Sequence, residues 1–397
     1  MRNPSARIDL QTVLAGCPAL QRAAAMERRA GMVRARQGAG ASRGMQRRPA
    51  ALGPAKRCCE RSAGQPADKG LMNCAERGSV LLYVVWVIML LSVFATTVSS
   101  QGSFAIQLSE RLTGQLQAAY LARAAVQFAA VMLERDPSPG IDGLSEEWSN
   151  SEVIFKSHAL AGGTFDVSLE EPNGQKRYGM SDEEGLINLN TAPMEVLQRL
   201  LEHLGQLPGD QAAEVASAIV DWRDKDDDRQ PPRGAEDFDY QTGEGYDCKD
   251  APFEQLEELL LVKGMTIRLY QRLADVVTVR GSGQVNLNTA GEDVLLALGL
   301  EPPSIDAFIA FRRGDDGQDG TPDDRVLAGL DELLSVISLV VSTTERKRLT
   351  ELTAQRLLEI RSRTFRMQIE AQGHRGAQIR AVCVMDREGS VLLWDEL

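Results

Sequence analysis

The stretch GSVLLYVVWVIMLLSVFATTV, residues 78–98, decides the architecture of this chain. It carries no charge and is long enough to cross a bilayer as a helix. A secretory signal peptide has a shorter apolar core and places its small, cleavable residues at the far end of that core. Here the small residues Gly78 and Ser79 stand at the near end, directly after the charged pair Glu76–Arg77. This order predicts cleavage before the apolar helix, near Gly78, with the helix retained.

Residues 1–78 are predicted to be a basic leader. Residues 1–70 contain 14 Lys and Arg against 4 Asp and Glu and lack apolar periodicity, which is typical of a disordered segment. Part of this leader is alternatively an over-extended reading frame whose natural start is Met72. In both cases the positive charge before the apolar run keeps this end in the cytoplasm and sends the rest of the chain across the membrane.

The exported part of the chain is strongly acidic. The formal charge of the 397 residues is −12, and since residues 1–70 carry +10, the remainder carries −22. A body of this charge repels the phosphates of nucleic acids. We therefore expect no nucleic-acid partner.

Residues 79–136 are predicted to form one uninterrupted helix. Apolar residues recur at helical spacing as far as Val131, and no proline interrupts the pattern before Pro137. The helix is much longer than a bilayer is thick, so its first half is expected in lipid and its second half against a globular domain. The Ala-rich stretch 118–130 suits a close approach to a sheet.

The globular part is predicted to be an α+β domain interrupted by a helical insertion. The segments TFDVSLE (164–170), FRMQIEAQG (365–373) and AQIRAVCVMD (377–386) alternate apolar and polar residues, as half-buried antiparallel strands do. The sequence between the first and second of these segments is mostly helical in pattern. We expect the first part of a sheet in residues 137–187, the helical insertion in residues 188–356, and C-terminal strands in residues 357–397.

The insertion contains an internal repeat. The segment LINLNTA (186–192) recurs as QVNLNTA (284–290), and an apolar helix follows each copy. Asn190 and Asn288 are expected to cap those helices, with the threonine that follows each asparagine as the alternative. A second helix is predicted after each first one.

The paired helices resemble helix-hairpin-helix, or SAM-like, modules, which in other proteins hold the DNA backbone with a glycine-rich turn. An exported DNA-binding protein of this kind is the alternative function. The expected Gly-Ile-Gly turn is missing, because the two copies read LPGD (207–210) and LEPP (300–303) at that place. Since the surrounding charge is also acidic, we interpret the repeat as structural.

Two acidic loops follow these helices. Carboxylates crowded into a short loop repel one another unless they are solvated or neutralised by a hard cation such as calcium. We predict calcium at both loops, and a solvated acidic surface is the alternative. The candidate ligands in the first loop are Asp221, Asp224, Asp226, Asp228, Glu236 and Asp237. Those in the second loop are Asp315, Asp316, Asp319, Asp323 and Asp324.

Cysteine and histidine usage gives little support for catalysis. Cys248 and Cys383 lie in the exported part, where they either form a disulfide or remain two separate buried thiols. The chain has three histidines and lacks HExxH, GxSxG and phosphate-loop motifs. We therefore expect no enzymatic activity. The other four cysteines precede the apolar run: Cys17, Cys58, Cys59 and Cys74.

Several motifs occur together between Arg77 and the C-terminus. Arg77-Gly78 precedes the apolar helix, and two NLNTA segments occur. The other motifs are AIVDWRDKDDD (218–228), GAEDFDY (234–240) and LEELLLVKGMT (256–266). Together they resemble the K-type minor pseudopilins of the bacterial type II secretion system.

This resemblance implies a pilin-like fold, in which a long N-terminal helix packs on an antiparallel sheet that carries a large helical insertion. It also implies that a prepilin peptidase cuts after Gly78 and that Ser79 becomes the N-terminal residue, usually methylated. The implied location is the inner membrane, crossed once, with the bulk of the chain in the periplasm. The implied partners are the I-type and J-type minor pseudopilins and the major pseudopilin.

Position 83 also agrees with the K-type. Major pseudopilins carry glutamate five residues into the mature chain, whereas Tyr83 stands at that position here, and the K-type is likewise an exception. A carboxylate in lipid is costly unless it meets a cation, which in pilin assemblies is the N-terminal amine of the subunit above. A subunit at the tip has no such neighbour. The resemblance thus implies a tip subunit that initiates and caps the pseudopilus and supports export of folded proteins across the outer membrane.

Overall fold

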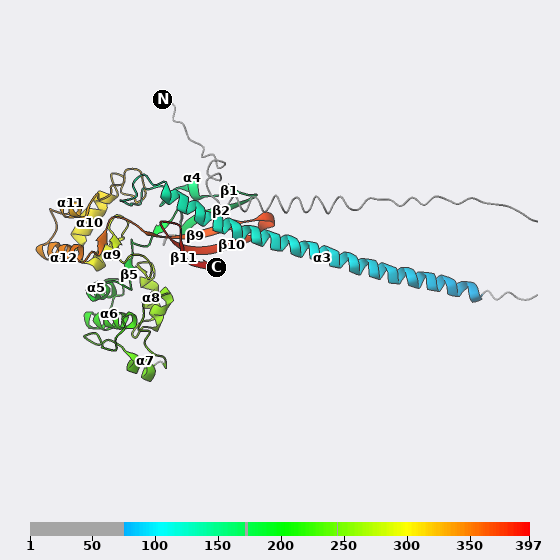
Figure 1. Cartoon of the computed structure of the whole chain (residues 1–397), viewed down its shortest axis with the longest axis horizontal. Coiled ribbons are helices and arrows are strands. Elements are labelled where there is room, and N and C mark those ends of the chain that lie inside the picture. Colours follow the sequence, from blue (N-terminus) through cyan, green and yellow to red (C-terminus); the bar gives the residue numbers. More distant parts are fainter. Residues whose placement is uncertain (1–74, 171–173, 244) are drawn as a thin grey trace, which may run out of the picture. The chain divides into compact units, whose positions relative to one another are not determined.

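The structure is a computed structural model that describes residues 75–170, 174–243 and 245–397. The predicted leader as far as residue 74, with its four cysteines, lies outside the described residues. The described chain begins with a helix of 60 residues, α3 (Ala75–Glu134), whose span includes Gly78 and Ser79 (Figure 1). At 1.5 Å per residue this helix is about 90 Å long.

The N-terminal half of α3 is the candidate membrane span. Among the residues that the structure describes, it is the one helix long and apolar enough to cross a bilayer, with a mean hydropathy of 2.4 in its most apolar window. None of that window is buried, and side chains such as Leu81, Trp86 and Phe94 are 64–70% exposed. Apolar side chains exposed on this scale require an apolar surrounding, which a bilayer provides.

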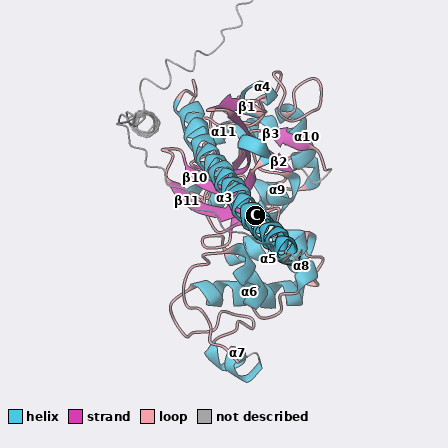
Figure 2. Ribbon diagram, turned by 90° about the vertical axis from the view of Figure 1, so that its right-hand side faces the viewer, coloured by secondary structure: helices cyan, strands magenta, loops and turns pink. Residues whose placement is uncertain are grey.

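One antiparallel sheet, whose strands are magenta in Figure 2, forms the body of the globular part. Its main path runs β1 (His158–Leu160), β2 (Gly163–Glu170), β9 (Thr364–Gln372), β10 (Gln378–Asp386) and β11 (Val391–Glu396). In addition, β3 (Lys176–Tyr178) pairs with β2, and β4 (Ser181–Asp182) pairs with β9. A short 3-10 helix, η2 (His374–Gly376), connects β9 to β10. Because β2 precedes the helical insertion and β9 follows it, their pairing confirms that the insertion interrupts one sheet.

The C-terminal half of α3 packs on this sheet, which confirms the predicted α+β fold class. Ala122, Ala125 and Ala129 of the predicted contact stretch are buried, and they share a core with sheet residues such as Phe165 and Ile369. Small side chains allow a helix backbone to approach a sheet closely. A short helix, α4 (Glu152–Phe155), adds Phe155 to the same core.

The insertion folds as two copies of one unit, coloured green to orange in Figure 1. The first copy contains β5 (Ile187–Asn188), α5 (Met194–His203), α6 (Gly209–Arg223), α7 (Asp237–Gly243), the 3-10 helix η1 (Leu256–Leu261), α8 (Ile267–Leu273) and β6 (Val277–Thr278). The second contains β7 (Val285–Asn286), α9 (Glu292–Leu298), α10 (Pro302–Arg312), α11 (Leu330–Val336), α12 (Thr343–Ala354) and β8 (Leu358–Glu359). In each copy the first and last strands pair in parallel, so the repeat extends well beyond the NLNTA motif. The two copies share one hydrophobic core.

The NLNTA asparagines have a different role from the predicted one. The prediction that Asn190 and Asn288 cap helices is wrong, because the N-cap positions of α5 and α9 are Pro193 and Gly291 and no side chain caps either helix. The following threonines do not cap them either: each hydroxyl donates to a distant acceptor, on Gly283 for the first and on Asp182 for the second.

Each asparagine instead clamps a distant backbone segment. The Asn190 carboxamide accepts from the Phe253 amide at 2.7 Å and donates to the Phe253 carbonyl at 3.0 Å. Asn288 does the same to Leu327, at 2.8 and 3.3 Å. A side-chain amide can satisfy both polar groups of one buried peptide unit in this way. The clamp therefore fastens the segment that follows each acidic loop to the start of its own copy.

Candidate functional site

The first acidic loop begins at the end of α6, where the Asp221 side chain is fully buried. Its Oδ1 accepts a hydrogen bond from the Gln230 amide at 2.9 Å, whereas its Oδ2 is buried without a partner among the described residues. A Cβ at Gly234 would lie 1.8 Å from that oxygen, so only glycine fits there. The loop is thus folded tightly around this carboxylate oxygen.

Three other carboxylates in the same region have the same deficiency. Asp224 Oδ1, Glu236 Oε1 and Asp250 Oδ1 are buried and have no hydrogen-bond partner in the described part of the chain. A buried charged oxygen without a partner is strongly destabilising, so natural proteins rarely tolerate several together. Four such oxygens in one region form a group whose negative charge a cation would neutralise.

Burial also raises the pKa values of two carboxyl groups in this region, those of Asp221 and Glu236. Burial raises the pKa of Asp221 to about 6, with the charge of Asp224 adding to it. Burial, together with the charges of Asp221, Asp250 and Asp224, raises the pKa of Glu236 to about 7. A bare carboxylate is thus disfavoured here, and a cation would favour it again.

Two positively charged side chains near these carboxylates, Lys249 and Arg223, bind other groups. Lys249 lies between Cys248 and Asp250 in sequence, yet its ammonium pairs with Glu258 at 2.6 Å. The Arg223 guanidinium donates to the carbonyls of Leu189 and Ala192. The ion pair of Lys249 and the hydrogen bonds of Arg223 therefore lie outside the carboxylate group.

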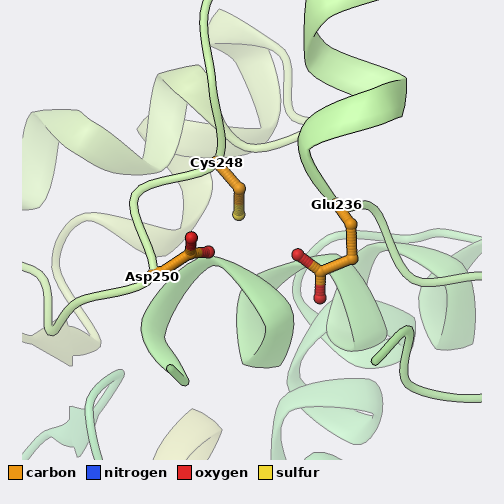
Figure 3. A group of neighbouring side chains, drawn as sticks. All are labelled: Glu236, Cys248 and Asp250. Atoms are coloured by element: carbon orange, nitrogen blue, oxygen red, sulfur yellow. The ribbon is translucent and has the colours of Figure 1, made fainter. Parts of the chain in front are cut away.

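A thiol completes the group (Figure 3). The ligand atoms of Glu236, Cys248 and Asp250 all lie within 4.8 Å of one another, and the three side chains point into one space. Burial raises the pKa of Cys248 to about 12, and its Sγ lies 3.7 Å from the Asp221 carbonyl and 3.8 Å from the Ala235 carbonyl. Cys248 and Asp250 are absent from the predicted ligand set, since they follow the loop by more than ten residues and no spacing motif marks them.

The other predicted ligands of the first loop are placed differently. Asp226 and Asp228 are exposed, and the Asp226 carboxylate accepts from the Asp228 amide at 3.1 Å. Asp237 accepts from the Cys248 amide at 2.8 Å, so it positions the backbone of the thiol residue. The structure therefore brings together Asp221, Asp224 and Glu236 of the predicted set and adds Asp250 and Cys248.

In the second loop the carboxylates have protein partners. Asp319 pairs with Arg312 at 3.3 Å and with Arg313 at 3.0 Å. Asp323 Oδ2 accepts from the amides of Asp315 and Asp316, at 2.7 and 3.1 Å. Calcium at this loop stays a prediction. The remaining contacts are Asp315 with Arg325, Asp316 with the Gln318 amide, and Asp324 with the Gly320 amide.

A second close carboxylate group lies at the end of α3, where Asp136, Asp142 and Glu146 also have oxygens within 4.8 Å of one another. The Arg387 guanidinium pairs with Asp136 at 3.0 Å and with Asp142. Glu146 accepts from the Trp148 indole at 2.7 Å. A protein cation and donors thus satisfy this group, in contrast to the group at Glu236.

The two buried cysteines are both free. Cys248 belongs to the core of the insertion, and Cys383 on β10 belongs to the core between α3 and the sheet. Of the two alternatives left open by the sequence, the structure therefore shows two separate buried thiols.

Asp182 on β4 joins the sheet to the insertion. Its carboxylate accepts from the Thr289 hydroxyl at 2.5 Å, from Asn286 Nδ2 at 3.1 Å and from the Glu184 amide at 2.8 Å. Burial raises its pKa from 3.8 to about 8, and the charge of Glu184 adds to the rise. The donors come from the second NLNTA segment, so this side chain couples the two parts of the fold.

Asp182 is expected to make the protein less stable as the pH rises. Because its folded-state pKa lies above the unfolded value of 3.8, its contribution is fully present below that value and is lost as the pH rises through about 8. Between about pH 5 and about pH 8, Asp182 should lower the unfolding free energy of the wild type by up to about 1.4 kcal/mol per pH unit. Asp182→Asn should not show this loss. The measurement is denaturant unfolding of the full chain in detergent with chelator present. The exposed carboxylate variant Asp210→Asn is the control, and parallel pH curves for wild type and Asp182→Asn would contradict the assignment.

Comparison with known proteins gives one consistent family. The model of the family described as Type II secretion system (T2SS), protein K, matches residues 169–282. The type II secretion system protein K of Klebsiella pneumoniae is 32% identical over 236 residues, which cover 56% of this chain and 69% of that protein. The protein K of Aeromonas hydrophila is 28% identical over 252 residues, which cover 59% of this chain and 74% of that protein.

A solved structure has a similar fold. It is a chain of the crystal structure of the GspK-GspI-GspJ complex from the enterotoxigenic Escherichia coli Type 2 Secretion System. The TM-score is 0.54 at 19% sequence identity, and the match covers 75% of this chain and 99% of that one. At this identity the similarity concerns the fold, a long helix and an antiparallel sheet with further helices.

Proposed function

This chain belongs to the family of type II secretion system protein K and is a minor pseudopilin of that system, and from this premise we propose that it occupies the tip of the periplasmic pseudopilus. There it initiates and caps assembly and supports export of folded proteins across the outer membrane. The family is a structural component of the secretion system. The acidic charge of the exported part disfavours the alternative function, an exported DNA-binding protein with helix-hairpin-helix modules, because it repels the phosphates of DNA.

The observation that carries the tip proposal is where the insertion is attached. Asp142, just beyond the C-terminal end of α3, donates its amide to the Ile360 carbonyl at 2.9 Å and accepts at its own carbonyl from Asn286 Nδ2 at 3.3 Å. The insertion is thereby fastened to the end of α3 that lies farthest along the helix from the candidate membrane span. A bulky domain at that end obstructs the position where a further subunit would stack.

Tyr83 supports the same placement. It stands where major pseudopilins carry glutamate, and its side chain is 73% exposed in the apolar half of α3. A subunit with no neighbour above needs no carboxylate to receive that neighbour's amine, and a lone carboxylate in lipid is costly. Removal of the insertion is the experiment that tests the tip proposal.

The proposed processing and partners follow from family membership. A prepilin peptidase cuts between Gly78 and Ser79, and Ser79 is then methylated. The mature chain stays in the inner membrane through α3, with its bulk in the periplasm. Its partners are the I-type and J-type minor pseudopilins, which the similarity to a chain of a GspK-GspI-GspJ complex supports, and the major pseudopilin.

We also propose calcium at the first acidic loop. The residues fit the ion, because four buried carboxylate oxygens without donors, on Asp221, Asp224, Glu236 and Asp250, are the hard ligands that calcium takes. When bound, the ion supplies positive charge that attracts carboxylates from the end of α6 and from residues 247–250, and so it holds these two segments together. The second loop is retained as a calcium prediction on sequence grounds alone.

Calcium is expected to stabilise the full chain in detergent relative to chelator. A ligand that binds only the folded state at 100 times its Kd adds about 2.7 kcal/mol to the unfolding free energy. Glu236→Gln should lose most of this increment, because it removes a charged buried oxygen. The matched control is Asp228→Asn in the same loop, which should retain the increment because Asp228 is exposed. Identical unfolding of the wild type in calcium and in chelator would rule out a stabilising site.

A further inference from the structure

We propose that the cation site at the first acidic loop also takes a thiophilic divalent metal of the zinc class, with Cys248 as the ligand that selects it. The inference rests on the proposed cation site. It goes beyond a calcium site, whose ligands are oxygens, because it assigns a role to the one sulfur atom that the structure places among them.

The geometry suits a small ion. Three atoms within 4.8 Å of one another surround a common centre that lies less than about 3 Å from each of them. Zinc bonds to carboxylate oxygen and thiolate sulfur are roughly 2.0–2.3 Å long, so small side-chain rotations bring the three atoms to bonding distance. The side chains of Glu236 and Asp250 face Cys248 from two sides (Figure 3). A water supplies the fourth ligand. This set provides the four ligands of a tetrahedral zinc site.

The neighbourhood holds the thiol in place for this role. Asp237 accepts from the Cys248 amide at 2.8 Å, and the thiol is only 7% exposed. Its Sγ lies 3.7 and 3.8 Å from the carbonyl oxygens of Asp221 and Ala235, which are weak partners for sulfur. Metal binding replaces the S–H proton by an S–metal bond and releases that proton to solvent, so no oxidant or reductant is needed.

Calcium and a zinc-class metal are expected to depend differently on the thiol. Calcium takes oxygen ligands and gains nothing from a sulfur atom. Zinc binds thiolate strongly, and loss of even an outer-sphere partner of a metal ligand costs about 10–100-fold in affinity. The two metals therefore share Glu236 and Asp250 and differ in their need for Cys248.

The chain offers a matched control thiol. Cys383 is also free and buried, but it lies in the apolar core beneath α3, among side chains such as Val126 and Met367. Its raised pKa has burial as its cause, with no carboxylate involved. Cys383→Ala thus removes a buried thiol without touching the cation site.

The test uses tag-free processed protein in detergent, stripped with chelator and kept reduced. The processed chain begins at Ser79 and therefore lacks Cys17, Cys58, Cys59 and Cys74, which could also bind the probe. Cobalt(II) serves as the optical probe, because a thiolate bound to cobalt gives a sulfur-to-metal charge-transfer band in the near ultraviolet. Zinc should displace cobalt and remove the band. Zinc affinity, from competition with a chromophoric chelator, should fall about tenfold or more in Cys248→Ser and stay unchanged in Cys383→Ala. Calcium affinity should change less than about twofold in both variants.

The outcomes separate this inference from the calcium proposal. One outcome is that wild type shows no cobalt band but binds calcium, and that Glu236→Gln loses calcium binding. That outcome would overturn the role of Cys248 and leave the calcium site standing. Equal zinc affinity in wild type and Cys248→Ser would do the same. If neither metal binds, both proposals fail together. Since the band is measured on wild-type protein, a variant that does not fold leaves the test intact.

Discussion

Gly78→Leu is expected to leave the chain uncut and to stop secretion altogether. The cut proposed between Gly78 and Ser79 requires a residue without a side chain on its near side, and an uncut subunit keeps a charged leader that has no place in a pseudopilus core. Mass spectrometry of the membrane fraction should find the full-length chain in the variant and a product beginning SVLLY, residues 79–83, in the wild type. Secretion is measured as the amount of an exported protein in the medium.

Ala75→Leu is the control for this experiment. It places the same bulky side chain three residues before the proposed cut, still within the charged flank that contains Glu76–Arg77. Cleavage and secretion should stay normal in this variant. A product of mature size from Gly78→Leu would defeat the assigned cleavage point, whatever happened to secretion.

Removal of the insertion is expected to produce a folded pilin-like subunit that no longer caps. The design deletes residues 187–360 and joins Leu186 to Arg361 through a short Gly/Ser linker. The ends are close, because the Glu183 amide donates to the Thr364 carbonyl at 2.9 Å and Glu184 Oε2 accepts from the Thr364 amide at 2.8 Å. The sheet can therefore close without the helices.

The variant also carries Asp182→Asn, since the donors from Asn286 and Thr289 leave with the insertion and a buried unpaired carboxylate would destabilise the sheet. Overproduction of the major pseudopilin should then give longer or more numerous pseudopili, measured by electron microscopy, together with a loss of secretion. The point variant Asp182→Asn in the intact chain is the control and should leave pilus length unchanged. Unchanged length in a deletion variant that is folded and co-purifies with the I-type and J-type pseudopilins would sink the capping role.

Features with a strong local pattern could be predicted from the sequence. The long uncharged run and the absence of proline as far as Pro137 determine α3, because a helix of this kind satisfies its own backbone groups whatever it packs against. Alternation in residues 164–170 and 365–373 marks β2 and β9, because a half-buried strand exposes every second side chain. Only their pairing across the insertion required the structure.

Contacts between distant segments could not be predicted. Asn190 and Asn288 look like helix caps, because asparagine before a helix usually is one, yet they clamp Phe253 and Leu327 instead. The tertiary fold brings those peptide units to the asparagines, and a buried peptide unit needs both of its hydrogen bonds. No local propensity contains that information.

The sequence by itself determined a long apolar helix, an interrupted sheet, a repeated helical insertion and an acidic loop. Which carboxylates face one another was decided by the tertiary structure alone. Asp226 and Asp228 have the right chemistry but point to solvent, whereas Cys248 and Asp250, more than ten residues beyond Glu236, share its buried space. The reason is physical: charge is a property of each residue, but burial and mutual distance, which make a group of carboxylates bind an ion, arise only when the chain folds back on itself.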